Sequence, residues 1–134
     1  MRRILALDYG ERRIGVAISD PLGLTAQSQP FVSNNAESLS KIATLIAEFE
    51  VTEIILGWPL NLKGEATAAC DKVAEFESRL REKTSLPIYR IDERLTTKAA
   101  ERTLLQADFS RDKRKQLIDS QAAAFLLEGY LARK

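Results

Sequence analysis

The sequence predicts an α/β fold built on a five-stranded mixed sheet, with helices packed on its faces. Two short apolar runs, 4–7 and 14–18, flank a polar connector that contains Gly10, a pattern typical of a β-hairpin. Farther along, apolar runs of strand length alternate with segments of helical periodicity, which indicates parallel strands joined by crossover helices. Residues 1–134 are 45% hydrophobic and 29% charged, a composition that suits a single globular domain.

The first three strands are expected to be antiparallel because short turns join them. The first run ends at Asp8, and the second leads directly into Ser19. A turn at 21–23 introduces a third strand over 24–32, where polar and apolar residues alternate. The polar residues at 33–35 have the chemistry of a helix start.

The second half of the chain alternates between helix and strand. Apolar residues at helical spacing predict a helix over 39–49, and the nearly all-apolar run 51–56 predicts a strand covered on both faces. A helix over 65–83 and a strand over 86–91 complete a parallel crossover unit. The remaining residues predict two more helices, which cover 96–105 and 116–132.

Composition excludes several classes of chemistry. The chain has no histidine, so a His-based triad, a His general base and most zinc sites are ruled out. A single cysteine, Cys70, cannot form a disulfide within the chain, which fits a reducing cytoplasm. No apolar run approaches the roughly 20 residues of a membrane span, and the run after Arg2 and Arg3 is too short for a signal peptide. We therefore expect a cytoplasmic protein without a membrane partner, whose catalysis depends on carboxylates, hydroxyls, Lys, Arg or bound metal.

Three acidic positions are candidates for one cluster. Asp8 ends the first strand, and an acid at 92 or 93 ends the fifth, at the sheet edge where open α/β folds place their ligands. Neighbouring strand residues point to opposite faces, so only one of Asp92 and Glu93 can readily face Asp8. Asp119 lies three and four residues before Ala122 and Ala123, which predicts that it turns toward the apolar side of its helix. The alternative for each acid is an ordinary capping or solvated carboxylate.

Four motifs in this order closely resemble the YqgF/RuvX family over essentially the whole chain. They are DYG at 8–10 with RIGVA at 13–17, GWPLN at 57–61, DERLTT at 92–97 and DSQAAA at 119–124. That family belongs to the ribonuclease H-like nucleases and is described as a Holliday junction resolvase or a pre-16S rRNA nuclease. The resemblance implies a sheet with three antiparallel and two parallel strands.

The resemblance also implies a catalytic set of Asp8, Glu93 and Asp119, with Asp92 as the alternative to Glu93. These three carboxylates would repel one another unless a divalent cation lies among them, and Mg²⁺ or Mn²⁺ prefers such ligands. Two ions would activate water and stabilise the leaving oxygen of a phosphodiester.

Basic and amide side chains are expected to hold the substrate. Guanidinium groups make bidentate contacts with phosphate, so Arg13 and Arg94 are candidates, and Asn61 and Lys63 follow the fourth strand. A basic run before the last helix is predicted to lie in a mobile loop and to follow the phosphates; it comprises Arg111, Lys113, Arg114 and Lys115. Its alternative is a solvated face. Trp58 is a candidate for stacking a base or, equally, for packing.

Two readings without nuclease activity compete with this one. An actin-like ATP-binding domain also opens with an Asp-x-Gly hairpin, but it needs a second domain, for which 134 residues leave no room. A non-catalytic RNA-binding assembly factor would have no need of three converging acids. Among nucleases, we place 5′-end maturation of pre-16S rRNA ahead of junction resolution, because a resolvase is expected to be a dimer and no dimer surface is evident. The expected partners are a structured RNA precursor or branched DNA, with ribosomal particles, and the chain is expected to be a monomer or weak homodimer.

Overall fold

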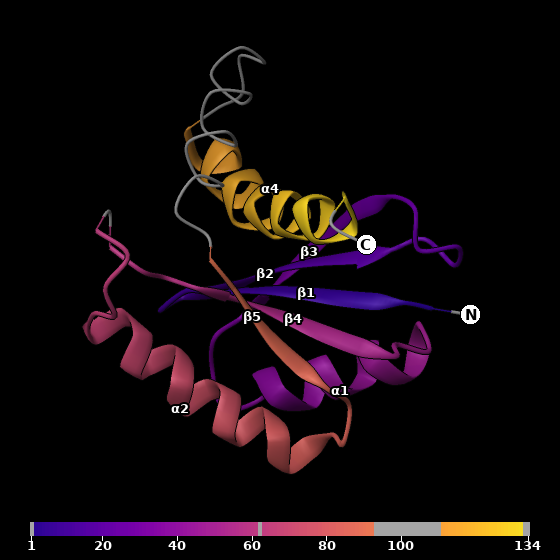
Figure 1. Cartoon of the computed structure of the whole chain (residues 1–134), viewed down its shortest axis with the longest axis horizontal. Helices are drawn as coiled ribbons and strands as arrows, with labels where there is room; N and C mark the ends of the chain where they lie inside the picture. Colours follow the sequence, from indigo (N-terminus) through magenta and orange to yellow (C-terminus); the bar gives the residue numbers. More distant parts are fainter. Residues whose placement is uncertain (1, 62, 93–110, 133–134) are drawn as a thin grey trace.

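The computed structural model describes residues 2–61, 63–92 and 111–132, with side chains from 121 onward in the last of these ranges. Five strands form one sheet in the order β3-β2-β1-β4-β5. Their bounds are β1 Ile4–Tyr9, β2 Arg13–Ser19, β3 Ala26–Ser33, β4 Glu53–Trp58 and β5 Ile88–Asp92. The helices that flank the sheet in these ranges are α1 Ser38–Glu48, α2 Ala68–Lys83 and α4 Arg111–Ala132 (Figure 1).

Strand pairing confirms the predicted mixed sheet. β1–β2 and β2–β3 are antiparallel pairs, whereas β1–β4 and β4–β5 are parallel pairs. The β2–β3 register shifts between Ile14 and Val16, which pair with Val32 and Gln29. Pro30 lies in this irregular stretch of β3, at the edge of the sheet, where a missing backbone N–H costs little.

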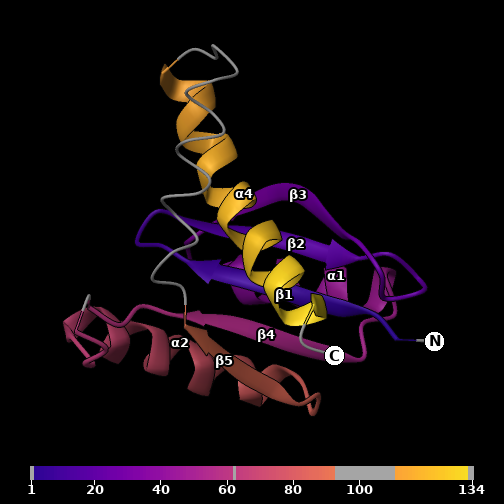
Figure 2. The ribbon, with the colours of Figure 1, turned by 45° about the horizontal axis from the view of Figure 1, so that its top comes forward.

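Helices cover both faces of the sheet, as the sequence predicts. Figures 1 and 2 show α1 and α2 on one side and α4 on the other. Alternation along β1 supplies both cores: Leu5 and Leu7 pack toward α1 and α2, whereas Ile4 and Ala6 pack toward α4. Small side chains at the α4 side, including Ala123, let the helix lie close to the strands. The alternation therefore determines the face of the sheet to which each side chain at the end of β1 projects.

Local side-chain hydrogen bonds explain where two elements begin later than predicted. The Asp20 carboxylate accepts hydrogen bonds from the backbone N–H groups of Leu24 and Thr25 at 2.6 and 2.9 Å. This turn delays β3 to Ala26, instead of residue 24. Similarly, the Asn61 side chain accepts from the N–H of Glu65 at 2.9 Å, and α2 begins at Ala68 rather than 65.

The last helix is longer than predicted. α4 begins at Arg111, not near residue 116, so the basic run is helical and the predicted loop does not extend over Arg111, Lys113, Arg114 and Lys115. The physical reason is that Lys and Arg are good helix formers, and no glycine or proline interrupts the chain between 111 and 128. The helix predicted over 96–105 lies outside the described residues. Within the described part of the chain, none of the helices has the length and apolarity that crossing a membrane requires.

Candidate functional site

Asp8 lies near the end of β1, on the side of the sheet that faces α4. It follows Ile4 and Ala6 in the alternation and is half-buried. Its antiparallel partner on β2 is Gly15. On the other side, the parallel register pairs Leu7 with Leu56, so the next residue of β4, Gly57, continues the row beside Asp8. The carboxylate is thus flanked on both neighbouring strands by buried residues without side chains.

The turn after Asp8 requires glycine. A Cβ atom on Gly10 would lie 2.5 Å from the backbone oxygen of Arg13, far closer than two such atoms can approach. The Asn34 side chain also donates a hydrogen bond of 2.8 Å to the Gly10 oxygen, and the Asn34 N–H donates to the Arg12 oxygen at 2.9 Å. These bonds attach the tight β1–β2 turn to the end of β3 and fix the end of β1.

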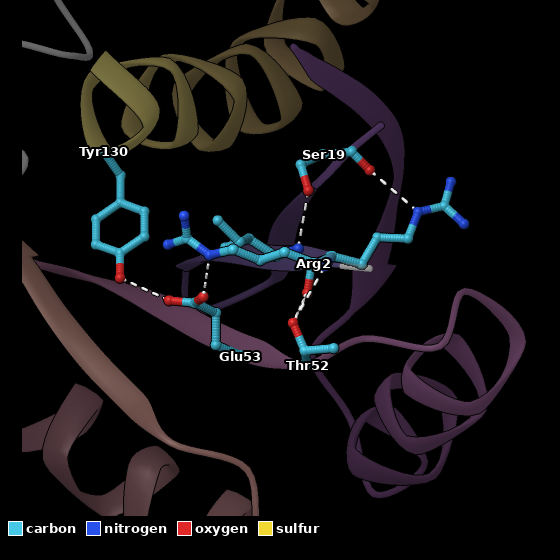
Figure 3. A network of polar contacts seen from close by, with 7 residues as sticks. Arg2, Ser19, Thr52, Glu53 and Tyr130 are labelled. Carbon is cyan, nitrogen blue, oxygen red and sulfur yellow. Dashed lines mark hydrogen bonds and ion pairs between the residues drawn. The ribbon is translucent and has the colours of Figure 1, made fainter. Parts of the chain in front are cut away.

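A polar network fixes the direction of α4 across the sheet. Near the carboxyl end of the helix, the Tyr130 hydroxyl donates a hydrogen bond of 2.6 Å to Glu53 Oε2, at the start of β4 (Figure 3). Arg2 Nε donates to Glu53 Oε1 at 2.7 Å, and this bond holds the pKa of the Arg2 guanidinium above its ordinary value. The end of α4 therefore lies at the beginning of β1 and β4, and the helix runs back toward their carboxyl ends.

The backbone of Asp119 lies on α4, the helix that covers the same face of the sheet as Asp8. Asp119 precedes Tyr130 by 11 residues, which is about 16 Å of helix. Ile4, the β1 partner of Glu53, precedes Asp8 by four residues, which is about 13 Å of strand. Two residues after Asp119, the Gln121 side chain contacts Ser28 on β3, so α4 crosses the sheet obliquely, from β4 at Tyr130 to β3 at Gln121. The side chain of Asp119 lies outside the described part of the structure.

Asp92 lies on the other face of the sheet. On β5, Ile88 packs toward α2, and Arg90 donates a hydrogen bond of 2.8 Å to Glu77 on that helix. Ile91 packs instead on the α4 side. Alternation therefore places the Asp92 side chain with Ile88 and Arg90, opposite the face that Asp8 serves. Glu93 lies outside the described residues.

The predicted substrate-binding residues are dispersed. Arg13 precedes Gly15 by two residues on β2 and is half-buried, with its guanidinium carbon 5.4 Å from the Phe31 ring centroid. Asn61 shapes its own loop by accepting the N–H groups of Lys63 and Glu65, while Lys63 is exposed. Arg94 and the side chains of Arg111, Lys113, Arg114 and Lys115 lie outside the described part. Among the predicted substrate-binding residues, Arg13 is the one with a described side chain that alternation places on the Asp8 face.

A charged cluster at the carboxyl ends of β4 and β5 was not predicted. The Arg90 guanidinium lies 4.0 Å from the centre of the Trp58 ring, and Glu77 accepts hydrogen bonds from Arg90 and Arg81. Burial raises the pKa of Glu77, but the hydrogen bonds and positive charges of Arg90 and Arg81 together outweigh it and hold the pKa below its ordinary value. Trp58 also packs against the core. Glu77 on α2 precedes Arg90 on β5 by thirteen residues, and no local sequence pattern indicates that the two are in contact.

Within the described side chains, no three acidic or cysteine residues form a group that could hold a metal ion. Of the predicted ligands Asp8, Glu93 and Asp119, Asp8 is the one whose side chain the structure describes. Its half-buried carboxylate and its two glycine neighbours fit a metal ligand. A complete ligand set needs residues from beyond the described side chains.

The arrangement defines the class of α/β folds found in structure-specific resolvases. A structure titled "T. thermophilus RuvC in complex with Holliday junction substrate" matches with a TM-score of 0.61 over 99% of this chain and 96% of that one, at 14% identity. The Fowlpox virus resolvase in complex with Holliday junction DNA matches with a TM-score of 0.56 over 98% of this chain and 97% of that one, at 15% identity. These similarities confirm the ribonuclease H-like fold.

The chain belongs to the RuvX family, described as Holliday junction resolvase, whose model matches residues 2–133. A relative from Desulfitobacterium hafniense strain DCB-2 is 46% identical over 129 residues, which cover 96% of this chain and 91% of the relative. One from Halothermothrix orenii is 48% identical over 131 residues, which cover 96% and 94%. Both relatives are named "Putative pre-16S rRNA nuclease". The family resemblance drawn from the four motifs is confirmed.

Proposed function

We propose that this protein is a nuclease that hydrolyses phosphodiester bonds in nucleic acid. The observation on which this rests is the position of Asp8 at the end of β1, between Gly15 and Gly57, on the face that α4 covers. With no side chain on either neighbour, a cation and a phosphate oxygen would meet no steric block beside this carboxylate from β2 or β4. Membership of the RuvX family and the names of the relatives support the same activity.

The proposed metal ligands are Asp8, Glu93 and Asp119, with two Mg²⁺ or Mn²⁺ ions as the expected occupants. Asp92 is the weaker candidate because it shares the far face with Arg90. Strand alternation would direct the next residue toward Asp8, which favours Glu93. Bound cations of this kind activate water and stabilise the leaving oxygen. The protein contributes the carboxylates and a rigid strand end, which the Gly10 turn fixes.

The proposed path of the nucleic-acid backbone crosses the α4 side of the sheet. Arg13 supplies a guanidinium there, and the Phe31 ring at 5.4 Å restrains it. The amino-terminal turns of α4 add four basic residues at the end of the helix that projects beyond the strands (Figure 2): Arg111, Lys113, Arg114 and Lys115. Such residues neutralise phosphates without reading sequence. Arg94, Asn61 and Lys63 remain proposed contacts.

The favoured substrate is precursor 16S rRNA, cleaved during 5′-end maturation in the cytoplasm, with ribosomal particles as the partner. The shared name of the relatives supports this choice. A four-way DNA junction is the second candidate, supported by the description of the family.

One preparation should be tested on both substrates. Wild type and Asp8→Asn would be incubated with a labelled precursor 16S fragment and a four-way DNA junction, with Mg²⁺, with Mn²⁺ or with a chelator. Asp71→Asn, an exposed acid on α2, is the control of equal charge change. We expect cleavage of the RNA by wild type and by the control, and none by Asp8→Asn or with chelator. Cleavage by Asp8→Asn at the wild-type rate would exclude this site, and preferential cleavage of the junction would reverse the order of substrates.

A further inference from the structure

The α1 and α2 side of the sheet contains a groove directly behind the candidate nuclease site. A cavity of about 530 Å³ opens between the start of α1, the middle of α2 and the β1–β2 turn. A second cavity of about 290 Å³ lies at the start of α2 and is lined by Gly10, Pro59 and Val73. Both cavities share Tyr9, Glu11 and Lys72, so they are two compartments of one groove.

An aromatic pair lines the larger compartment. Tyr9 follows Asp8 on β1 and points to the opposite face, where its ring lies 4.8 Å from that of Phe76 at an interplanar angle of 40°. Phe76 is buried, whereas Tyr9 is half-buried and lines both compartments. A flat aromatic side chain at a cavity wall can stack a heteroaromatic ring, a contact that is sequence-tolerant for nucleic-acid bases.

Two asparagines offer complementary hydrogen-bonding groups beside this wall. Asn34 donates from its amide nitrogen to the Gly10 oxygen, and this bond leaves its amide oxygen as an acceptor. Asn35 accepts the Glu37 N–H through its amide oxygen, which leaves its amide nitrogen as a donor. Both residues line the larger cavity. One acceptor and one donor on adjacent residues match the mixed edge of a nucleobase.

The divide between the compartments is a weak ion pair. Lys72 on α2 contacts Glu11 in the β1–β2 turn, and both side chains are exposed to solvent. Exposed pairs of this kind contribute little to stability. A phosphate oxygen can therefore replace Glu11 as the partner of Lys72, most readily on a terminal monophosphate, which carries about −1.5 to −2 charge. Arg79 and Glu75 form a second exposed pair at the rim, so the groove is close to neutral. A neutral rim suits recognition of one base better than general attraction of a phosphate backbone.

From these contacts we propose that the groove binds one unpaired nucleotide, with its base against Tyr9, its base edge at Asn34 and Asn35, and its phosphate at Lys72. The nucleotide would come from the substrate strand or be a free mononucleotide that regulates the enzyme. The first source rests on the proposed nuclease function, because the groove and Asp8 occupy opposite faces of the same strand end.

Binding should be measured by calorimetry in the presence of a chelator, so that no strand is cleaved. The probes are adenosine and uridine 5′-monophosphate and a single-stranded five-nucleotide RNA. Lys72→Ala and Asn35→Ala should each weaken binding about fivefold, the factor for one lost hydrogen bond. Lys83→Ala, on the same helix but outside the groove, is the matched control and should bind as wild type.

A pair of Tyr9 variants isolates stacking. Tyr9→Phe retains the ring and should bind like wild type, whereas Tyr9→Leu should lose at least about fivefold in affinity. Tight binding of the monophosphates indicates a free nucleotide, and binding of the RNA alone indicates the substrate strand; either result supports the groove. The proposal is overturned if no probe binds. It is also overturned if Tyr9→Leu, Asn35→Ala and Lys72→Ala all bind the probes with wild-type affinity.

The two functions can fail separately. Asp8→Asn should leave binding in the groove unchanged, because Asp8 faces the other side of the sheet. If the wild-type protein binds a nucleotide in the groove but cleaves neither substrate, the nuclease proposal alone is refuted. Cleavage by a protein whose groove binds no nucleotide would refute the groove alone.

Discussion

Asp8 on β1 pairs directly with Gly15 on β2, across the antiparallel junction of the first two strands. Paired residues of an antiparallel sheet project to the same side, so a side chain at 15 would stand beside the Asp8 carboxylate. The absence of a side chain at residue 15 distinguishes this strand pair from the preceding pairs of β1 and β2 on the same face. Ala6 pairs with Ala17, and both are packed under α4.

Gly15→Ala is therefore expected to reduce cleavage more than tenfold, because the new methyl group occupies space beside Asp8. Because Gly15 is buried, the methyl group should also cost roughly 1–3 kcal/mol of stability. Gly129→Ala is the control: its Cβ would meet no atom within 4 Å, and the change should stabilise α4 by about 0.5–1 kcal/mol. Cleavage rates and thermal unfolding of both variants test this. Full activity in Gly15→Ala would show that the space is not used.

Glu93→Gln is expected to abolish cleavage, whereas Asp92→Asn should retain most of it. The reason is the alternation of side chains along β5: Arg90 contacts Glu77 on the α2 side, whereas Ile91 packs on the α4 side. Asp92 accordingly belongs to the Arg90 face. Single-turnover cleavage and Mn²⁺ affinity should be compared for both variants. An inactive Asp92→Asn protein beside an active Glu93→Gln protein would reverse the assignment.

The Glu77 cluster predicts a specific loss of stability in acid. The folded-state pKa of Glu77 lies below the ordinary value of 4.5, so its contribution is present above pH 4.5 and is lost as the pH falls through the folded-state pKa. Glu77→Gln should be less stable than wild type at neutral pH by roughly 1 kcal/mol. That difference should shrink as the pH falls below 4.5. Urea unfolding across this range is the measurement, and a difference independent of pH would contradict the expectation.

Tyr130→Phe is expected to destabilise the protein by about 1–2 kcal/mol, because it leaves a lone pair of the buried Glu53 carboxylate without its donor. Tyr9→Phe is the matched control, because it also removes one phenol hydroxyl and keeps the ring contact with Phe76. Chemical denaturation measures both. Equal stability of the two variants would mean that the hydroxyl of Tyr130 does not hold α4 to β4.

The sequence was sufficient for the architecture because that depends on periodicity. The strands, the crossover unit and the position of Asp8 at a strand end all follow from local patterns. The starts of β3 and α2 could not be predicted in this way. Asp20 and Asn61 accept hydrogen bonds from backbone N–H groups that would otherwise belong to the first residues of β3 and α2. The Arg90, Glu77 and Trp58 contacts also escaped prediction, since they join residues that only the folded sheet brings together. The catalytic roles of Asp8, Glu93 and Asp119 stay predictions.

Asp8 and Tyr9 share one peptide bond and serve opposite faces of the sheet. A slip of β1 by one residue would exchange them, placing a carboxylate against Phe76 and a phenol ring under α4. Any insertion or deletion within β1 would therefore disable both faces together, even if every apolar residue found a buried position. The pairing register of this strand is thus itself a functional constraint. Substitutions that preserve hydrophobicity but weaken the register should impair activity before they unfold the protein.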